Sequence, residues 1–167
     1  MTATAHPKFA LRPFLPADVA VLAEIFRDSI GELTSDDYSE AQQEAWAASA
    51  EDEAEFAKRL GKQLTLVATM QGSPVGFASV TGNEKLDMLY VHPGVAGHGV
   101  AAMLADALEK LAAARGAKKL TVDASDTARG FFEKRGYVAQ QRNSVSVGDE
   151  WLANTTLTKT FAQGKPS

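Results

Sequence analysis

The chain contains no cysteine among its 167 residues. Disulfide bonds and metal sites built on thiolates are therefore excluded. Long apolar runs are also missing, because no uninterrupted stretch approaches the roughly 20 residues that a membrane-spanning helix needs. The first residues lack the charged-then-apolar layout of a signal peptide. We therefore expect a cytoplasmic protein with no membrane partner.

Positive charge is scarcer than negative charge, with 17 lysines and arginines against 21 acidic residues and a formal net charge of -4. No global positive field is available to recruit nucleic acid, so we expect no nucleic-acid partner. Apolar side chains make up 45% of the chain, which is enough for one buried core. We expect a single domain over residues 1–167, with residues 162–167 as a frayed polar tail.

Hydrophobic spacing predicts a strand and two helices in the first third of the chain. A short strand over residues 9–12 is followed by apolar residues at helical spacing, which indicate a helix over residues 19–31. Ser39 followed by Gln42 is typical of a capping box. We therefore expect a second helix over residues 40–61, with Ser49 as a potential interruption.

Three strands are predicted next, over residues 64–70, 75–80 and 86–91. The first two are joined by a turn sequence and should form an antiparallel hairpin. Strict alternation in the third strand predicts two faces. One face would carry Leu86, Met88 and Tyr90, and the other Asp87, Leu89 and Val91.

The cleanest amphipathic stripe covers residues 100–111 and predicts a helix. A strand over residues 120–124 follows, then a helix capped by Ser125, then two strands that flank a Gly148-Asp149 turn. The predicted order is βααβββαβαββ. It indicates an α/β (α+β) fold with a mixed, mostly antiparallel central sheet and helices on both faces.

The segment between the third strand and the strongest helix favours anion binding. Pro93 ends the strand, and Gly97 and Gly99 allow backbone N–H groups to face outward at the start of the helix. The alternative is a tight turn that needs glycine only to bend. Residues 97–102 (GHGVAA) also fit the dinucleotide fingerprint, with Asp123 as a ribose-binding acid. The lateness of the fingerprint in the chain argues against that oxidoreductase interpretation.

Two motifs resemble the GCN5-related N-acetyltransferase (GNAT) family. Residues 91–93 (VHP) and 96–101 (AGHGVA) are similar to its V-x-P and [QR]-x-x-G-x-[GA] pyrophosphate loop. Residues 125–137 (SDTARGFFEKRGY) are similar to its later N-x-x-A-x-x-F-Y-E-K-x-G-F. The resemblance covers residues 64–167, and the front region resembles a subgroup of small bacterial acetyltransferases. It implies a GNAT-like fold, acetyl-CoA as cosubstrate and an amine as acceptor.

The resemblance also implies which residues bind acetyl-CoA. In the family the pantetheine arm pairs with the strand before the loop, and a backbone N–H near Leu89 polarises the thioester carbonyl. The implied contacts are Met88, Leu89, Tyr90 and Val91 on the strand, Gly97, His98, Gly99, Val100, Ala101 and Ala102 in the loop and helix start, and Ser125 and Phe132 in the later motif.

Three positions depart from the family pattern. Ala96 stands where the family has Gln or Arg, so one side-chain contact is absent although the backbone amides remain. Ser125 replaces an Asn, and its hydroxyl either substitutes for that contact or only caps the helix. Phe132 replaces the Tyr that often protonates the departing thiolate. The usual acid is therefore missing from its usual position.

An alkylamine has a pKa near 10.4, so only about one molecule in a few thousand is neutral at pH 7, and a base must help either directly or through water. Asp87 is the first candidate, because the strand carrying the thioester should place it on a largely apolar face where desolvation raises its pKa. The alternative for Asp87 is a strand-edge carboxylate paired with a cation. Glu84 and Asp123 are weaker candidates.

Two tyrosines are candidates for the catalytic acid. Tyr38 belongs to the front region that covers the acceptor pocket in the family, and its alternative role is an apolar contact before the Ser39 cap. Tyr137 is nearest to Phe132, and its alternative role is core packing. Water could also protonate the thiolate. We expect no metal site, since His92 and His98 lie too close together on a loop.

The sequence thus predicts an acetyl-CoA-dependent N-acetyltransferase whose acceptor, a primary amine, attacks directly in a ternary complex. The alternative is an acyl-CoA-binding sensor domain without turnover, because position 132 lacks a hydroxyl. Exposed strand edges in such sheets often pair, so we also expect a homodimer.

Overall fold

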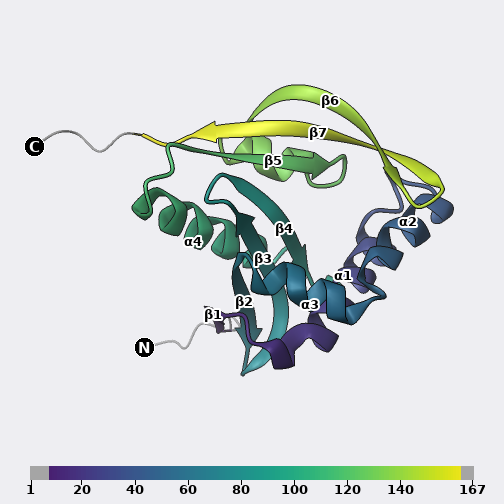
Figure 1. Cartoon of the computed structure of the whole chain (residues 1–167), viewed down its shortest axis with the longest axis horizontal. Helices are drawn as coiled ribbons and strands as arrows, with labels where there is room; N and C mark the ends of the chain where they lie inside the picture. Colours follow the sequence, from purple (N-terminus) through teal and green to yellow (C-terminus); the bar gives the residue numbers. More distant parts are fainter. Residues whose placement is uncertain (1–7, 163–167) are drawn as a thin grey trace, which may run out of the picture.

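A computed structural model describes residues 8–162, which form a seven-stranded sheet in the order β1-β2-β3-β4-β5-β7-β6 (Figure 1). Every neighbouring pair is antiparallel except β4 and β5. The expected mixed, mostly antiparallel sheet is confirmed, and a parallel dinucleotide-binding fold is excluded. The strands are β1 Phe9–Pro13, β2 Leu64–Met70, β3 Ser73–Thr81, β4 Lys85–Val91, β5 Lys119–Ser125, β6 Val138–Val147 and β7 Glu150–Thr160.

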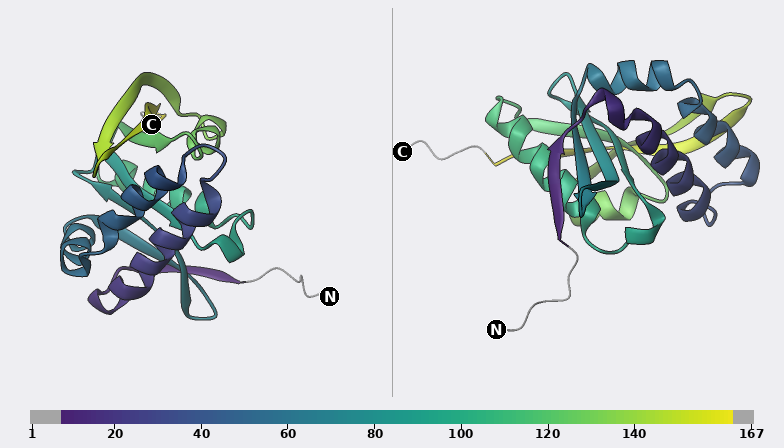
Figure 2. Two further views of the ribbon diagram at one scale, coloured as in Figure 1. Left: turned by 90° about the vertical axis from the view of Figure 1, so that its right-hand side faces the viewer. Right: turned by 90° about the horizontal axis from the view of Figure 1, so that it is seen from below.

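Helices cover both faces of the sheet (Figure 2). Helices α1 and α3 pack on β2, β3 and β4 through one apolar cluster around Phe26, Phe56 and Phe77, and α4 packs on the opposite face through a second cluster around Leu104. None of the helices in residues 8–162 is long and apolar enough to cross a membrane. The helices are α1 Val19–Leu33, α2 Glu40–Ala47, α3 Glu53–Gly61, α4 Val100–Ala114 and α5 Arg129–Lys134, with 3-10 turns η1 Pro16–Asp18, η2 Ala48–Ala50 and η3 Pro93–Val95.

The expected second helix is interrupted around Ser49, as predicted, and forms two helices. The Ser39 capping box starts α2 as predicted, with the Gln42 N–H 3.1 Å from Ser39 Oγ. However, α2 ends at Ala47, and Asp52 then caps a new helix by accepting a hydrogen bond from the Glu55 N–H at 3.1 Å. A carboxylate of this kind favours a fresh helix start over continuation.

Helix α1 continues two residues past Gly31, where the sequence predicted its end. The carbonyl oxygen of Ile30 accepts a hydrogen bond from Thr34 Oγ1 at 2.6 Å and another from Gln43 Nε2 at 3.1 Å. These donors replace the intrahelical partners that a helix end lacks. The extra half-turn brings Leu33 and Thr34 to the edge of the cavity described below.

A bulge in β4 exchanges the faces predicted for Leu86 and Asp87, whereas the faces predicted for residues 88–91 are confirmed. Ser79 of β3 pairs with Met88, whereas Val80 pairs with Leu86, so Asp87 is an extra residue opposite no partner. The bulge places Leu86 in the α4-side cluster with Leu89, and Met88 in the opposite cluster. Asp87 faces α3, on the same side as Met88.

The bulge is followed by a separation of β4 from β5. These strands pair only at Lys85 with Thr121 and at Leu86 with Val122, although both continue beyond that point. The bent and twisted β4 diverges from its parallel neighbour, as a bulge favours. The sheet therefore opens into a wedge between β4 and β5, visible in Figure 1.

Candidate active site

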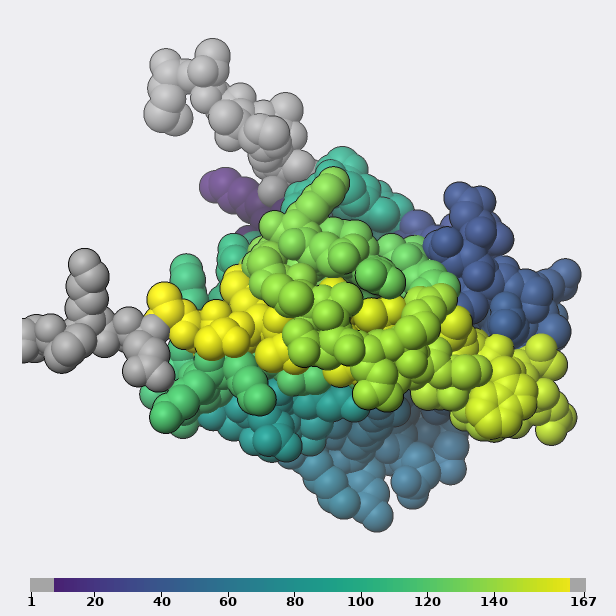
Figure 3. All heavy atoms as spheres, turned by 90° about the horizontal axis from the view of Figure 1, so that it is seen from above, coloured from purple at the N-terminus to yellow at the C-terminus, as the bar shows by residue number. Residues whose placement is uncertain are grey.

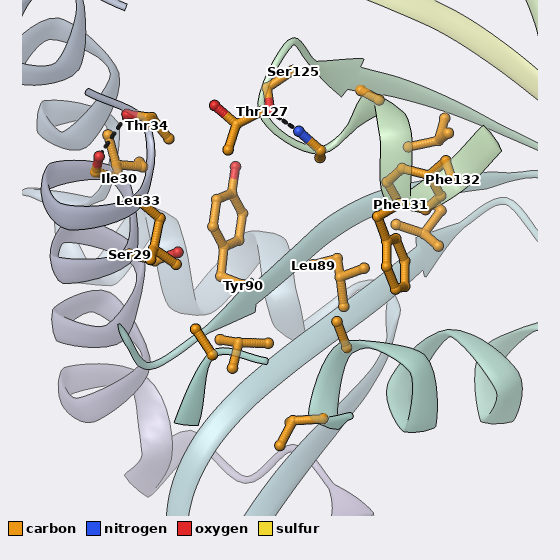
Figure 4. Close-up of a pocket in the computed structure, with 18 of the residues that line it drawn as sticks. Ser29, Ile30, Leu33, Thr34, Leu89, Tyr90, Ser125, Thr127, Phe131 and Phe132 are labelled. Carbon is orange, nitrogen blue, oxygen red and sulfur yellow. Dashed lines mark hydrogen bonds between the residues drawn. The ribbon is translucent and has the colours of Figure 1, made fainter. Parts of the chain in front are cut away.

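A cavity of about 590 Å³ lies in this wedge. Its walls come from β4, the start of α4, the end of β5, the start of α5 and, at the other end, the end of α1 (Figure 4). Trp46 of α2 also lines that end. Both predicted motifs therefore line one continuous space. The α1 wall was missed, because the sequence interpretation gave α1 a packing role only. Its members are Ser29, Ile30, Leu33 and Thr34.

The loop before α4 is built to present free amides. His92 Nδ1 accepts a hydrogen bond from the Gly94 N–H at 2.9 Å and fixes the turn η3. Gly97 and Gly99 then adopt φ values of 81° and 85°, which side chains rarely allow. Their N–H groups donate to no hydrogen-bond acceptor among residues 8–162. They lie beside the unpaired first-turn N–H groups of α4, a favourable site for an anion.

The space above these glycines fits a phosphate group. A Cβ added at Gly97 or Gly99 would meet no atom within 4 Å, so open volume lies where a side chain would project. Most of the residues expected to bind acetyl-CoA line the cavity: Leu89, Tyr90, Val91, Gly97, Gly99, Val100, Ala101, Ala102, Ser125 and Phe132.

Two of the expected contacts, Met88 and His98, are not part of the cavity wall. The Met88 side chain is 4% exposed and packs in the core beside Phe77, so only its main chain can serve the wedge. His98 is exposed and is not part of the cavity wall.

Ser125 Oγ accepts a hydrogen bond from the Ala128 N–H at 3.1 Å, while α5 begins only at Arg129. Ser125 thus holds the turn before α5 instead of capping the helix directly.

The predicted rise in the pKa of Asp87 is wrong. Asp87 accepts hydrogen bonds at 2.9 Å from Arg59 Nε, Arg59 Nη2 and Gln63 Nε2, all from α3 or the residues after it. Burial acts to raise the pKa of this carboxyl, but the Arg59 and Gln63 hydrogen bonds together outweigh it and leave the pKa below its usual value. The alternative of a carboxylate paired with a cation is what the structure shows.

The second carboxylate on the cavity wall is also paired. Asp123 accepts hydrogen bonds from Lys85 Nζ at 2.8 Å and from Thr156 Oγ1 at 2.6 Å. Burial opposes ionisation of Asp123, yet these bonds keep its pKa below the usual value. Neither wall carboxylate is therefore poised as a base near neutral pH.

Neither candidate tyrosine lines the cavity. The Tyr38 hydroxyl donates to the Ala153 carbonyl at 2.6 Å and accepts from the Asp126 N–H at 2.9 Å, which ties the start of α2 to the sheet. Tyr137 is 2% exposed, packs against Phe132 and donates to Glu109 Oε2 at 3.0 Å. Burial raises the pKa of both hydroxyls. The core-packing interpretation of Tyr137 is confirmed.

Tyr90 is the tyrosine whose hydroxyl enters the cavity. Figure 4 shows its ring between the α1 side chains and Leu89, with the hydroxyl directed toward Thr127. Burial raises the pKa of Tyr90 to about 12, so the hydroxyl stays protonated. The sequence interpretation gave Tyr90 only a main-chain role. The signal missed for the opposite wall was Ser29, a buried polar residue within the apolar stripe of α1.

Comparisons with known proteins agree with this geometry. The family model of the acetyltransferase (GNAT) domain matches residues 34–154. Escherichia coli YafP, an uncharacterized N-acetyltransferase, is 35% identical over 144 residues, which is 86% of this chain and 91% of YafP.

Solved structures also resemble the chain. One from Rhodopseudomonas palustris, described as "GCN5-Related N-acetyltransferase: Aminotransferase, Class-II", is 63% identical with a TM-score of 0.91 and covers 96% of this chain and 99% of its own. Thermoplasma acidophilum PaiA N-acetyltransferase, solved with coenzyme A, shares the fold at 18% identity and a TM-score of 0.76, over 92% of this chain and 99% of its own. The chain belongs to the GNAT family of N-acetyltransferases.

Proposed function

We propose that the protein transfers the acetyl group of acetyl-CoA to a primary amine by direct attack in a ternary complex. The observation that carries this proposal is the wedge between β4 and β5. At one end lie Gly97 and Gly99, which have positive φ values, at the N-terminus of α4. At the other end α1 and Trp46 form a separate wall. Donor and acceptor can therefore enter one cavity from different ends, as a ternary complex requires.

Main-chain groups of this chain hold the donor. The free amides of Gly97, Gly99 and the first turn of α4 bind the diphosphate. Beyond Leu86 the β5-facing edge of β4 has no strand partner, so an extended pantetheine arm can pair with it as an added strand. A β4 N–H beside the thioester then polarises its carbonyl. Acetyl-CoA supplies the acetyl group as a thioester.

The proton balance closes without a dedicated acid. A C–N bond forms and the C–S bond breaks; the nitrogen loses one proton and the sulfur gains one. Asp87 and Asp123 are both held in ion pairs, so we propose that the neutral fraction of the amine attacks and that water relays the proton. Tyr90, protonated inside the cavity, serves as a hydrogen-bonding group. Its pKa of about 12 makes it a poor proton donor to a thiolate with a pKa near 8.5.

The test combines calorimetry with a thiol-release assay. We expect acetyl-CoA to bind and free thiol to appear only when an amine acceptor is added. Binding without acceptor-dependent release would favour the sensor alternative. Absence of acetyl-CoA binding would overturn both.

We further propose a single cytoplasmic domain spanning residues 1–167 that acts without nucleic acid, in keeping with a net charge of -4. We also propose a homodimer through the edge strand β6, which Figure 3 shows spread across one face of the molecule with β7. Val138 is 62% exposed there, and β6 contains no proline or lysine to block pairing. Sedimentation of the protein, with Val138→Lys as the disrupting variant, tests the dimer.

A further inference from the structure

The cavity has an end that the expected acetyl-CoA contacts do not use. Those contacts lie on β4, at residues 97–102, and at Ser125 and Phe132. The opposite end is formed by the last turn and a half of α1 and by Trp46. If the proposed function holds, this end receives the amine acceptor, and its chemistry selects the acceptor.

Within the described part of the chain, no unpaired charged side chain lines that end. The carboxylates on the cavity wall are Asp87 and Asp123, and each is already bound to a cation, at 2.9 Å from Arg59 and 2.8 Å from Lys85. No lysine or arginine among residues 8–162 lines the cavity. A second ammonium group, a carboxylate or a phosphate on the acceptor would therefore lose its hydration without gaining a partner.

The surfaces available there are apolar and aromatic. Ile30 is buried, and Leu33 is 38% exposed at the cavity mouth. The Trp46 ring meets the Tyr90 ring edge to face, with centroids 6.4 Å apart, and Tyr90 in turn packs on Phe26 at 4.6 Å. A flat apolar body can bury large areas against such rings.

Hydroxyl groups supply the polar contacts of this end. Ser29 Oγ takes part in no hydrogen bond among residues 8–162, although Ser29 is only 7% exposed. The Tyr90 oxygen faces the cavity, already interacts with the Trp46 side chain, and keeps a second lone pair that can accept a bond from an amine N–H. Neutral acceptors of this kind orient one amine without demanding a second charge.

The segment that supplies α1 and Trp46 is more acidic than basic. Arg27 is the single basic residue between positions 19 and 50, whereas Glu32, Asp36 and Glu40 are exposed. Exposed carboxylates attract amine cations in general and do not distinguish one cation from another. Selection among amine acceptors therefore depends on the uncharged lining of the cavity end.

We propose that the acceptor is an arylalkyl monoamine, one primary amine on a neutral, ring-sized apolar body that packs against Leu33, Trp46 and Tyr90. This inference rests on the proposed acetyl transfer and narrows its substrate class. It disfavours polyamines, free amino acids and phosphorylated amines.

The experiment measures kcat/KM by thiol release with matched amines. 2-Phenylethylamine carries the proposed body; phenylalanine adds a carboxylate to it, 4-(2-aminoethyl)benzylamine adds a second amine, and ethylamine lacks the ring. We expect 2-phenylethylamine to exceed each of the others by about tenfold or more. Trp46→Ala should lower kcat/KM for 2-phenylethylamine about tenfold more than it lowers that for ethylamine. Trp151→Ala, whose side chain is 64% exposed on the β6–β7 hairpin, is the matched control and should alter neither.

Calorimetry with acetyl-CoA distinguishes failure of the arylalkylamine inference from failure of the acetyltransferase proposal. If acetyl-CoA binds and spermidine or a lysine peptide is the better acceptor, the arylalkylamine inference is overturned and the acetyltransferase proposal stands. An equal effect of Trp46→Ala on both amines would likewise overturn the inference. Absence of acetyl-CoA binding, or of thiol release with every amine, would overturn both proposals.

Discussion

Asp87 decides the electrostatics of the cavity wall. The bulge in β4 turns its carboxylate toward α3, where Arg59 and Gln63 bind both oxygens. The Asp87 side chain is 15% exposed and that of Arg59 is 48% exposed, so the guanidinium forms the solvent side of the pair. Because the carboxylate is already neutralised, it presents little free charge to a substrate amine.

The pH dependence of turnover follows from this pair. In the wild type the depressed pKa of Asp87 keeps the carboxylate ionised throughout the neutral range, so kcat/KM should rise with pH toward the pKa of the amine without an inflection between about pH 5 and 8. In Arg59→Gln the guanidinium that lowers the pKa of Asp87 is lost while the burial that raises it remains, so we expect the pKa of Asp87 to rise. Lys58→Gln, an exposed neighbour on α3, is the control. A wild-type inflection that Asp87→Asn abolishes would restore Asp87 as the base.

The loop glycines allow a second test at single residues. Gly99→Ala puts a methyl group into the open space above the loop and forces a positive φ on alanine. We expect the Kd for acetyl-CoA, measured by calorimetry, to rise about tenfold or more. Gly116→Ala imposes a similar strain, at a φ of 96°, beyond the C-terminal end of α4. An equal loss in both variants would mean that strain, and not blocked binding, is responsible.

At the scale of elements, a buried carboxylate fastens α4 to the C-terminal strands. Glu109 of α4 is 7% exposed and accepts hydrogen bonds from Lys159 Nζ at 2.7 Å, Tyr137 Oη at 3.0 Å and Arg135 Nη2 at 3.2 Å. Two cations and one hydroxyl compensate its burial. The network holds α4, whose N-terminus forms the anion site, against the half of the sheet that contains β7.

Tyr137→Phe tests whether this hydroxyl is structural. Loss of one buried hydrogen bond to a charged group should lower the free energy of unfolding by about 1–3 kcal/mol in a denaturant titration. The value of kcat should stay within about twofold of the wild type, because Tyr137 does not line the cavity. A loss of kcat of tenfold or more at unchanged stability would instead place the hydroxyl in the reaction.

Local patterns predicted most elements well. The strand over residues 64–70, the capping box at Ser39 and the helix beginning at Val100 are all confirmed. The bulge at Asp87 escaped prediction, because it depends on how β3 and β4 pair and not on the order of residues in β4. The interruption of the helix over 40–61 at Ser49 was predicted, whereas the new start capped by Asp52 was not, although Asp is a typical N-cap residue.

On the scale of the whole molecule, the sheet consists of two parts joined by a short seam. Within residues 8–162, strands β1 to β4 pair with strands β5, β7 and β6 only at two residue pairs of β4 with β5. The cavity lies where the seam ends, and its walls come from both parts. A ligand in the wedge therefore contacts both parts at once.

Acetyl-CoA should for this reason stabilise the whole protein. At 100 times its Kd a ligand specific to the folded state adds about 2.7 kcal/mol, which for a chain of this size raises Tm by roughly 5–10 °C. Differential scanning calorimetry gives the shift, and hydrogen exchange should show added protection in both β4 and β5. Protection confined to one strand would contradict binding across the wedge.

The site was predictable where it is made of backbone and unpredictable where it is made of distant side chains. The conformation of Gly97 and Gly99 could be predicted from their residue type, because few other residues tolerate a positive φ. The partners of Asp87, Tyr38 and Tyr137 come from 28, 115 and 28 positions away along the chain. Such pairings set pKa values, and no local pattern encodes them.

The extra residue in β4 makes the chain unusually sensitive to length at one point. Removing Asp87 would make the β3–β4 ladder regular, and we expect β5 to pair with β4 along its whole length. Backbone hydrogen bonds between these strands would then occupy the space of the cavity. We expect the shortened chain to be at least as stable as the wild type but unable to bind acetyl-CoA. Deletion of one codon would then abolish turnover without unfolding the protein.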